Sequence, residues 1–256
     1  MKKNFLTTAI AAVFTAGIAT FGMTACNVEH FTYDDAERYK AGSANLTENV
    51  TELEIDWLLG NVNIAYGDVD TVTFSETSEE NLTVDMTMHY WLEDSTLHIK
   101  YAKSGVKLTN ETQPSKDLTV LLPATLTLKE VDLELVDANA VLMDINADEV
   151  EIDSIAGQVD ASFNSVREFS VTSISGDVDM RFATAPIEGE YENVHGNLTM
   201  YLPENSGFTI EAEKLAGAFE CDFDTVKSGN RYVYGNGASE YEFETVAGTI
   251  TLKKHL

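Results

Sequence analysis

Four glycines, at positions 157, 176, 196 and 217, recur at nearly constant spacing along this chain. Around each one, apolar residues alternate with small, polar or charged residues, as in Ile174-Ser-Gly176-Asp-Val178-Asp-Met180-Arg-Phe182. Alternation with a period of two indicates strands with one buried face. Such strands, repeated about every 20 residues, predict stacked coils that bury their apolar sides against one another. The sequence therefore predicts an all-β protein, folded as a single-stranded parallel β-solenoid (β-helix).

The pattern extends in both directions from these four repeats. Gly60 and Gly248 lie in the same alternating frame, so we expect one solenoid domain over residues 51–256. Ala138 occupies a glycine position, and the apolar residues after it fit the frame better one residue later, at Val141, Met143 and Ile145. This slip predicts a bulge, with Asn139 in the left-handed conformation that glycine adopts elsewhere.

The start of the chain has the features of an export signal. Lys2 and Lys3 precede an uncharged, largely apolar run over residues 5–25, and Cys26 follows directly. The segment Met23-Thr24-Ala25-Cys26 resembles the lipobox of bacterial lipoproteins, in which the cysteine becomes the lipidated first residue. We therefore expect a lipoprotein signal peptide over residues 1–25, followed by lipidated Cys26 and a polar tether over residues 26–50. An ordinary signal peptide with a chance cysteine is the alternative.

The charge of the chain limits its partners. The formal net charge is −27, with 43 acidic and 16 basic residues, and it becomes two units more negative when Lys2 and Lys3 leave with the signal. Such a chain repels nucleic acid and anionic lipid head groups, so neither is expected to bind. The hydrophobic fraction of 44% is ample for a core and argues against a disordered acidic chain.

The alternating register also assigns several residues to the core. With Cys26 lipidated, Cys221 has no disulfide partner, and it falls in an inward column with Ala161, Met180 and Met200. We expect a buried, unreactive thiol there. Phe163, Phe182, Leu202 and Phe223 form a second inward column. Trp91, Tyr90 and Tyr101 are expected in the core, with an exposed sugar-stacking patch as the alternative.

Several segments resemble a known family. They are Val50-Thr-Glu-Leu-Glu-Ile55-Asp-Trp57-Leu-Leu-Gly60-Asn-Val62, Lys116-Asp-Leu-Thr-Val-Leu-Leu-Pro123, the repeated Ile/Val-x-Gly-x-Val motifs, and Thr245-Val-Ala-Gly248-Thr-Ile250. The chain is similar from about residue 45 to its end to the bacterial adhesin-like family known by its domain of unknown function 4097. The resemblance implies a parallel β-solenoid anchored at the cell envelope, and it supplies no catalytic residues.

We next considered residues that could carry chemistry. Asp160, Asp179 and Glu220 share one outward column, in which adjacent coils lie about 5 Å apart, so Asp160 and Asp179 could share a Ca²⁺ ion. The alternative is a solvated acidic face, with Arg181 neutralising charge. His195 is expected at a surface corner. The sequence contains no His-Glu-x-x-His, Cys-x-x-Cys, phosphate-loop or Gly-x-Ser-x-Gly motif.

These observations favour a protein without catalytic activity. We expect an exported lipoprotein, anchored through Cys26 to the cell membrane or outer membrane and facing away from the cytoplasm. It would act as an adhesin-like binding or scaffolding module for a protein or glycan at the cell surface, with no cofactor apart from the Ca²⁺ considered above. The alternatives are a carbohydrate-active enzyme that uses surface carboxylates and a component of an envelope-stress sensor.

Overall fold

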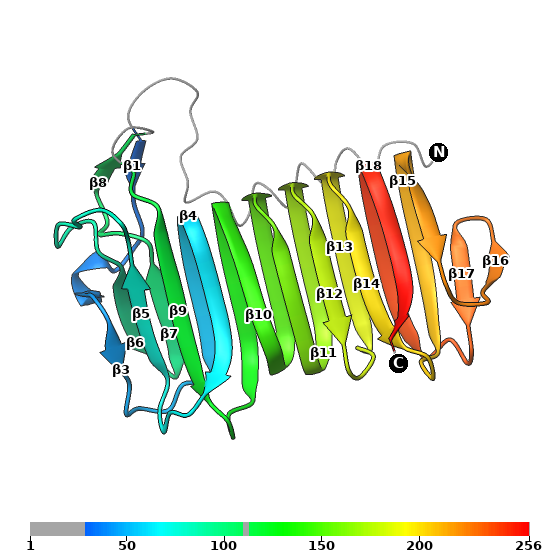
Figure 1. The fold of residues 1–256 in the computed structure, drawn as a ribbon, viewed down its shortest axis with the longest axis horizontal. Coiled ribbons are helices and arrows are strands. Elements are labelled where there is room, and N and C mark those ends of the chain that lie inside the picture. Colours follow the sequence, from blue (N-terminus) through cyan, green and yellow to red (C-terminus); the bar gives the residue numbers. More distant parts are fainter. Residues whose placement is uncertain (1–28, 110–112, 256) are drawn as a thin grey trace.

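A computed structural model describes residues 29–109 and 113–255, and these residues form an all-β protein with a single short 3-10 helix (Figure 1). In chain order the elements are β1 (Glu29–Phe31), the 3-10 helix η2 (Ala36–Arg38), β2 (Lys40–Ala41), β3 (Ala44–Asn45), β4 (Glu52–Gly67), β5 (Thr73–Thr77), β6 (His89–Glu93), β7 (Thr96–Lys100), β8 (Val106–Leu108), β9 (Lys116–Pro123), β10 (Leu128–Ala156), β11 (Val159–Ser175), β12 (Val178–Phe182), β13 (Glu188–His195), β14 (Leu198–Pro203), β15 (Phe208–Cys221), β16 (Val226–Ser228), β17 (Arg231–Tyr234) and β18 (Ser239–His255). Within the described ranges, no helix has the length and apolar character needed to span a membrane.

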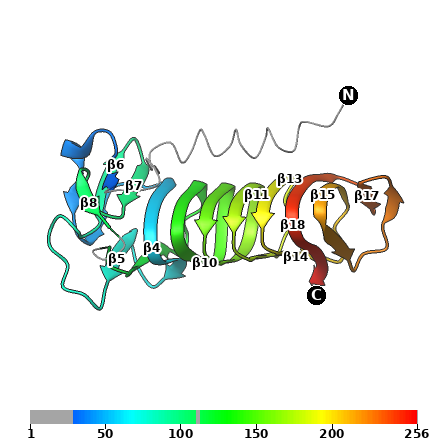
Figure 2. The same ribbon diagram turned by 90° about the horizontal axis from the view of Figure 1, so that it is seen from above.

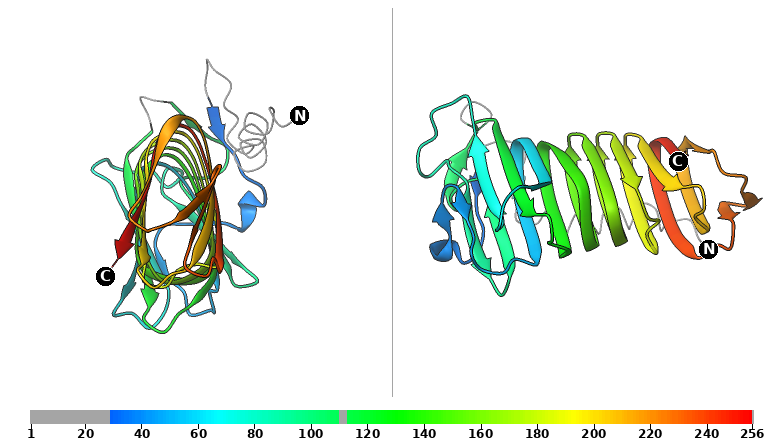
Figure 3. Two further views of the ribbon diagram at one scale, coloured as in Figure 1. Left: turned by 90° about the vertical axis from the view of Figure 1, so that its right-hand side faces the viewer. Right: turned by 60° about the horizontal axis from the view of Figure 1, so that its bottom comes forward.

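The body of the protein consists of stacked coils whose strands pair in parallel. Each coil has a segment before a corner residue and a segment after it. β4 pairs with β10 with Gly60 opposite Ala138, and β10, β11, β12, β13 and β14 continue the parallel pairing. Seen along the stack, the coils superimpose as one flattened tube (Figure 3). From above, they follow one another between antiparallel strands at the two ends (Figure 2).

The predicted glycine ladder forms the corners, and Gly176 shows why a side chain is excluded there. Its φ of +134° lies in the region that glycine favours. A Cβ atom at this position would collide with the carbonyl oxygen of Gly157 in the preceding coil. This corner is therefore a close backbone-to-backbone contact between coils, and both its conformation and its spacing require glycine.

The order of the coils differs from the order of the sequence at the C-terminal end. The sequence analysis placed the repeat around Gly217 directly after the repeat around Gly196. In the structure, β18 lies between them, because it pairs in parallel with β13 and β14 on one side and with β15 on the other (Figure 1). After β15 the chain reverses direction through β17, which pairs antiparallel with β15. The last strand, β18, therefore forms the second-to-last coil of the stack and β15 forms the last.

Inward-facing residues fill the tube in columns, as the alternation predicts. Phe163 and Phe182 are almost fully buried, and their rings stack with centroids 5.0 Å apart. The predicted slip after Ala138 is wrong in its position. Ala140 and Leu142 remain inward, whereas Met143 is 55% exposed.

The irregularity lies later in β10, where the register shifts between Leu142 and Ile145. Asp144 has the positive φ of 55° there, and Asn139 does not. Ala138 keeps the frame because its small side chain is accommodated opposite Gly60.

The N-terminal end of the stack is covered by antiparallel strands. β1 pairs with β8, β2 with β6 and β3 with β5, so residues 29–45 belong to the folded domain and are not the tether that we expected. Trp57 and Tyr101 are fully buried here in an edge-to-face contact at 5.2 Å. The Nζ atom of Lys116 lies 2.9 Å from Glu76 Oε2 and 4.0 Å from the Tyr101 ring centroid.

The C-terminal end of the stack is less covered. β17 pairs with β15 only over Phe208–Glu211, and the rest of β15 has β18 on one side alone. Cys221 is consequently only partly buried, which corrects the prediction of a core cysteine, although its inward column is as predicted. The partial burial raises the pKa of the Cys221 thiol.

Candidate functional surfaces

The segments before the corners present three columns of carboxylates, which we call the first face. Its members lie eight, six and four positions before each corner residue, and the columns follow from the parallel registers of β4, β10, β11, β13, β18 and β15. The first column is Glu52, Glu130, Glu149, Glu168, Glu188, Glu240 and Thr209; the second is Glu54, Asp132, Glu151, Ser170, Glu190, Glu242 and Glu211; the third is Asp56, Glu134, Asp153, Thr172, Glu192, Glu244 and Glu213. All but three positions carry a carboxylate.

This face was not predicted from the sequence. The predicted outward columns contain only residues that follow each glycine, whereas the first face consists of residues that precede it. The signal was nevertheless present, since acidic residues alternate with apolar ones in Glu130-Val-Asp132-Leu-Glu134 and in Glu188-Gly-Glu190-Tyr-Glu192. Counting backward from the corners would have revealed the ladder.

Burial and neighbouring like charges raise the pKa values of two carboxyls of β10 on this face. Burial, and then the charges of Glu151 and Glu54, raise the pKa of Asp132 to about 8. Burial and the charge of Asp56 likewise raise the pKa of Glu134 to about 8. Each of these carboxyls faces other carboxyls and lacks enough water or positive charge to favour ionisation. Near neutral pH, Asp132 and Glu134 therefore retain protons.

The N-terminal edge of the first face is neutralised by β7. Its Lys100 Nζ lies 2.6 Å from Glu54 Oε1 and 2.7 Å from Asp56 Oδ2, and His98 Nδ1 lies 2.8 Å from Glu54 Oε2. Burial disfavours ionisation of Glu54, but the hydrogen bonds and charges of His98 and Lys100 outweigh it and lower its pKa to about 2. One ammonium group thus serves two adjacent columns.

A groove of about 360 Å³ lies at this edge of the first face. His98 and the opposed pair Glu54 and Asp132 line it, together with Glu52, Leu53, Glu93, Asp94, Thr96 and Glu130. Trp91 stacks on the His98 ring at 5.5 Å just beside it. The predicted core assignment holds for Tyr101, which is fully buried, whereas Trp91 and Tyr90 are only partly buried.

The segments after the corners form a second face, which carries the predicted outward columns. Asp160, Asp179 and Thr199 are neighbours as expected, and Thr251 of the inserted β18 separates Thr199 from Glu220. Arg181 lies between the two candidate Ca²⁺ ligands, with Nη1 2.7 Å from Asp160 Oδ1 and Nη2 2.8 Å from Asp179 Oδ1. The arrangement favours neutralisation by arginine over a shared cation.

Metal binding finds no other support in the described part of the chain, where no group of three or more His, Cys, Asp or Glu side chains is arranged to hold an ion. The lipidation site Cys26 and the signal over residues 1–25 lie outside the described residues, so both stay predictions.

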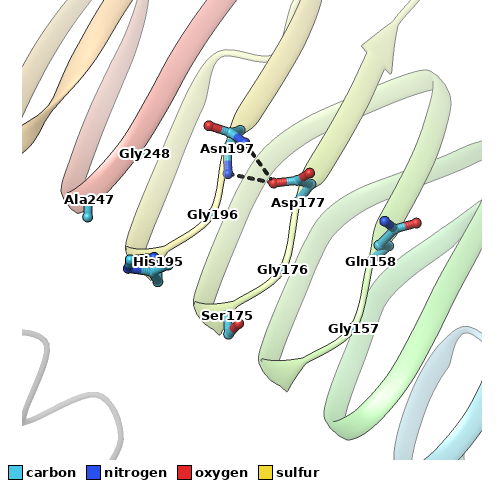
Figure 4. Close-up of a pocket in the computed structure, with 10 residues that line it drawn as sticks. All are labelled: Gly157, Gln158, Ser175, Gly176, Asp177, His195, Gly196, Asn197, Ala247 and Gly248. Atoms are coloured by element: carbon cyan, nitrogen blue, oxygen red, sulfur yellow. Dashed lines mark hydrogen bonds between the residues drawn. The ribbon is translucent and has the colours of Figure 1, made fainter.

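A shallow groove of about 480 Å³ runs along the corners themselves (Figure 4). His195 is exposed at its rim, as predicted for a corner residue. Polar groups that line the groove are used within the fold. The backbone N and Nδ2 of Asn197 donate hydrogen bonds of 2.9 and 3.0 Å to Asp177 Oδ1. Asn197 Oδ1 in turn accepts one from the backbone N of Thr249 at 3.0 Å. These hydrogen bonds join adjacent coils across the groove.

Known proteins are similar to this chain in family and fold. The model of the family described as Toastrack DUF4097 matches residues 50–188. Among solved structures, a candidate cell adhesion protein from Clostridium sporogenes ATCC 15579 aligns with a TM-score of 0.53 at 19% identity, over 85% of this chain and 100% of its own. A candidate adhesin from Bacteroides fragilis NCTC 9343 has a TM-score of 0.48 at 13% identity, over 85% and 98%. At 19% identity the likeness to the first of these structures concerns the fold alone. No curated protein matches the sequence.

Proposed function

Because this chain belongs to the Toastrack family, the domain of unknown function 4097, we propose that it is a non-catalytic binding or scaffolding module of the cell envelope. The observation that carries the proposal is the first face, which carries carboxylates in each of seven stacked coil segments. Because stacked coils repeat one surface pattern, such a surface is suited to binding an extended partner. The proposed anchor is lipid on Cys26.

The anchor is tested by labelling cells with radioactive palmitate. We expect the wild-type chain to be labelled and Cys26→Ser to be unlabelled, because acylation of a lipoprotein occurs on its first mature residue. Cys221→Ser is the matched control and should be labelled as strongly as wild type. An unlabelled wild type, or loss of label from Cys221→Ser, would contradict the anchor.

The absence of catalysis is tested with the purified protein on a glycan array, with and without Ca²⁺. We expect that any bound glycan is recovered intact. Appearance of new reducing or unsaturated ends would show that the protein cuts its ligand.

One observation favours a carbohydrate-active enzyme as a second candidate. Glu54 and Asp132 lie opposite each other in the groove beside β7, and their surroundings displace their pKa values in opposite directions, to about 2 and about 8. A carboxylate beside a protonated carboxyl is the pair that glycoside hydrolysis needs. If this candidate is right, Asp132→Asn should abolish release of reducing ends, while Glu220→Gln on the second face should leave it unchanged.

A further inference from the structure

Most of the first face has no counter-ion within the described residues. The cations near it lie at its margins, where Lys100 contacts Glu54 and Asp56, Lys129 contacts Glu52, Arg167 contacts Glu168, and Arg231 contacts Glu211. The carboxylates that β10, β13 and β18 contribute to the columns form no salt bridge in the described part of the chain. Their charge is left for protons or for a bound cation to neutralise.

Glu192 in the third column shows that this is more than a solvated acidic surface. Its side chain belongs to a residue that is only 6% exposed, and its Oε2 atom has no hydrogen-bond partner among the described residues. The charges that act on it are those of Glu190, Glu244 and Asp153. A buried carboxyl without a partner is costly, so a donor supplied from outside would be favoured there.

The contact of Lys100 shows which chemistry fits between the columns. Two acids that alternate on one strand lie about 6.7 Å apart along it, and a single ammonium group contacts both Glu54 and Asp56 there. The same alternation occurs in β10, β13 and β18. Alternate side chains of an extended peptide recur at the same spacing of about 6.7 Å, so lysines at every second position would match adjacent columns.

We propose that the first face binds a lysine-rich, extended segment of a partner protein, with its ammonium groups between the carboxylate columns of β10, β13 and β18. This inference rests on the proposed binding function and names the chemistry of the partner. Charge complementarity selects the segment. A divalent cation is less suited, because no three carboxylates among the described residues converge on one point.

Binding should release protons and therefore strengthen as the pH rises. Burial and the charges of Glu190 and Glu244 raise the pKa of Glu192 to about 7. Asp132 is faced by Glu54 and Asp56 of β4 and by Glu151 and Asp153 of the next coil, and Glu134 is faced by Asp56, Lys100, Asp132 and Asp153. An ammonium group favours the ionised form of each carboxyl, so protonation at low pH competes with the ligand.

The test is binding of a fluorescent peptide of alternating lysine and serine, with three lysines to span the three columns, to the full chain purified in a non-ionic detergent. Fluorescence anisotropy is measured for the wild type and for Glu151→Gln/Glu190→Gln/Glu242→Gln, which removes three charges of the second column. The matched control is Glu220→Gln/Asp222→Asn/Asp224→Asn, which removes three exposed charges beyond the corners. Thermal unfolding checks that all three proteins are folded.

We expect the first-face variant to bind at least about tenfold more weakly and the control variant to change affinity less than about twofold. For the wild type, affinity should be at least about tenfold higher at pH 8.5 than at pH 6.0. Absence of binding by folded wild type, or equal weakening in both variants, would overturn the inference. So would displacement of the peptide by millimolar Ca²⁺ or by spermine at equal charge, since small cations would then be the preferred occupants. None of these results would alter palmitate labelling of Cys26, which tests the envelope module separately.

Discussion

On the second face Arg181 lies between Asp160 and Asp179, whereas on the first face no described cation lies between Asp132 and Glu151. Both faces belong to the same coils and have the same spacing between strands, about 4.8 Å. The second face mixes its acids with Asn, Thr, Tyr, Lys and Arg. The first face repeats acids in every coil segment, and among the described residues its salt bridges lie at its margins.

This difference teaches that the acidic ladder is not a requirement of the fold. On the second face, the same coils carry neutral side chains and charges of both signs. On the first face, like charges repel one another and weaken the folded state. The acidic ladder thus opposes stability without being demanded by the architecture, which is consistent with the binding role that we propose.

The largest effect on stability is expected at the corners, which the two faces share. Gly176→Ala should lower the free energy of unfolding by about 3 kcal/mol or more, because its Cβ would collide with the Gly157 carbonyl oxygen at a positive φ. Gly229→Ala is the control, since its φ is also positive but nothing lies within 4 Å of the added atom. It should cost only about 1 kcal/mol. Urea denaturation measures both, and equal costs would show that close contact between coils is unimportant.

The next effect is the pH dependence that the first face imposes. Unfolded carboxyls titrate near pH 4, whereas the pKa values of Asp132 and Glu134 are about 8 in the folded protein. Between these values the folded state binds more protons, so this stabilisation is fully present below pH 4 and is lost as the pH rises toward 8. We expect the free energy of unfolding to fall by about 1–3 kcal/mol from pH 5 to pH 8.5, after allowance for solvent screening.

Denaturation across this pH range should show a much shallower slope for Asp132→Asn/Glu134→Gln. Arg181→Gln should keep the wild-type slope because it changes only the second face. Stability that stays constant or rises from pH 5 to pH 8.5 would mean that Asp132 and Glu134 are ionised throughout.

A smaller effect is expected when an arginine is introduced between two carboxylates of the first face, as Arg181 lies between two on the second face. Ser170 lies between Glu151 and Glu190 in the second column. Ser170→Arg should therefore stabilise the protein by about 1 kcal/mol at pH 8. The melting temperature of Ser170→Gln, which adds length without charge, provides the comparison. If both substitutions shift it equally, charge repulsion is not what distinguishes the faces.

The smallest effect should come from removing the arginine of the second face. Arg181→Gln should lower the free energy of unfolding by about 0.5–1 kcal/mol. The side chains of Asp160 and Asp179 are 61% and 34% exposed, so water screens much of their repulsion. The difference should shrink in 1 M NaCl. A double-mutant cycle with Asp160→Asn measures the pair, and a coupling energy near zero would remove Arg181 as the neutralising group.

Several features were accessible from the sequence because they depend on local periodicity. Gly176 and its equivalents marked the corners, and alternation placed Phe163 and Phe182 inward. The shift in β10 was placed too early, because Val141 and Met143 are apolar enough to suggest an inward position. In the structure Ala140 and Leu142 occupy it, and Asp144 absorbs the extra residue.

The candidate site was only partly accessible. The acids of the first face were visible as an alternating pattern, and a backward count from the corners would have aligned them. Their lack of counter-ions was not visible, since it depends on which strands flank the columns. Lys100, which is far from the repeats in sequence, neutralises one edge because β7 pairs with β4.

The sequence by itself determined the coil, because the period of two and the corner glycines are properties of neighbouring residues. The tertiary structure decided the order in which the coils lie. β18 could enter between β14 and β15 because parallel coils of one pattern offer equivalent edges, and local periodicity does not distinguish among them. That choice leaves Cys221 in a partly covered end coil and extends the acidic columns through Glu240, Glu242 and Glu244. Long-range pairing thus assembled the continuous first face from acids that local sequence placed only on their own strands.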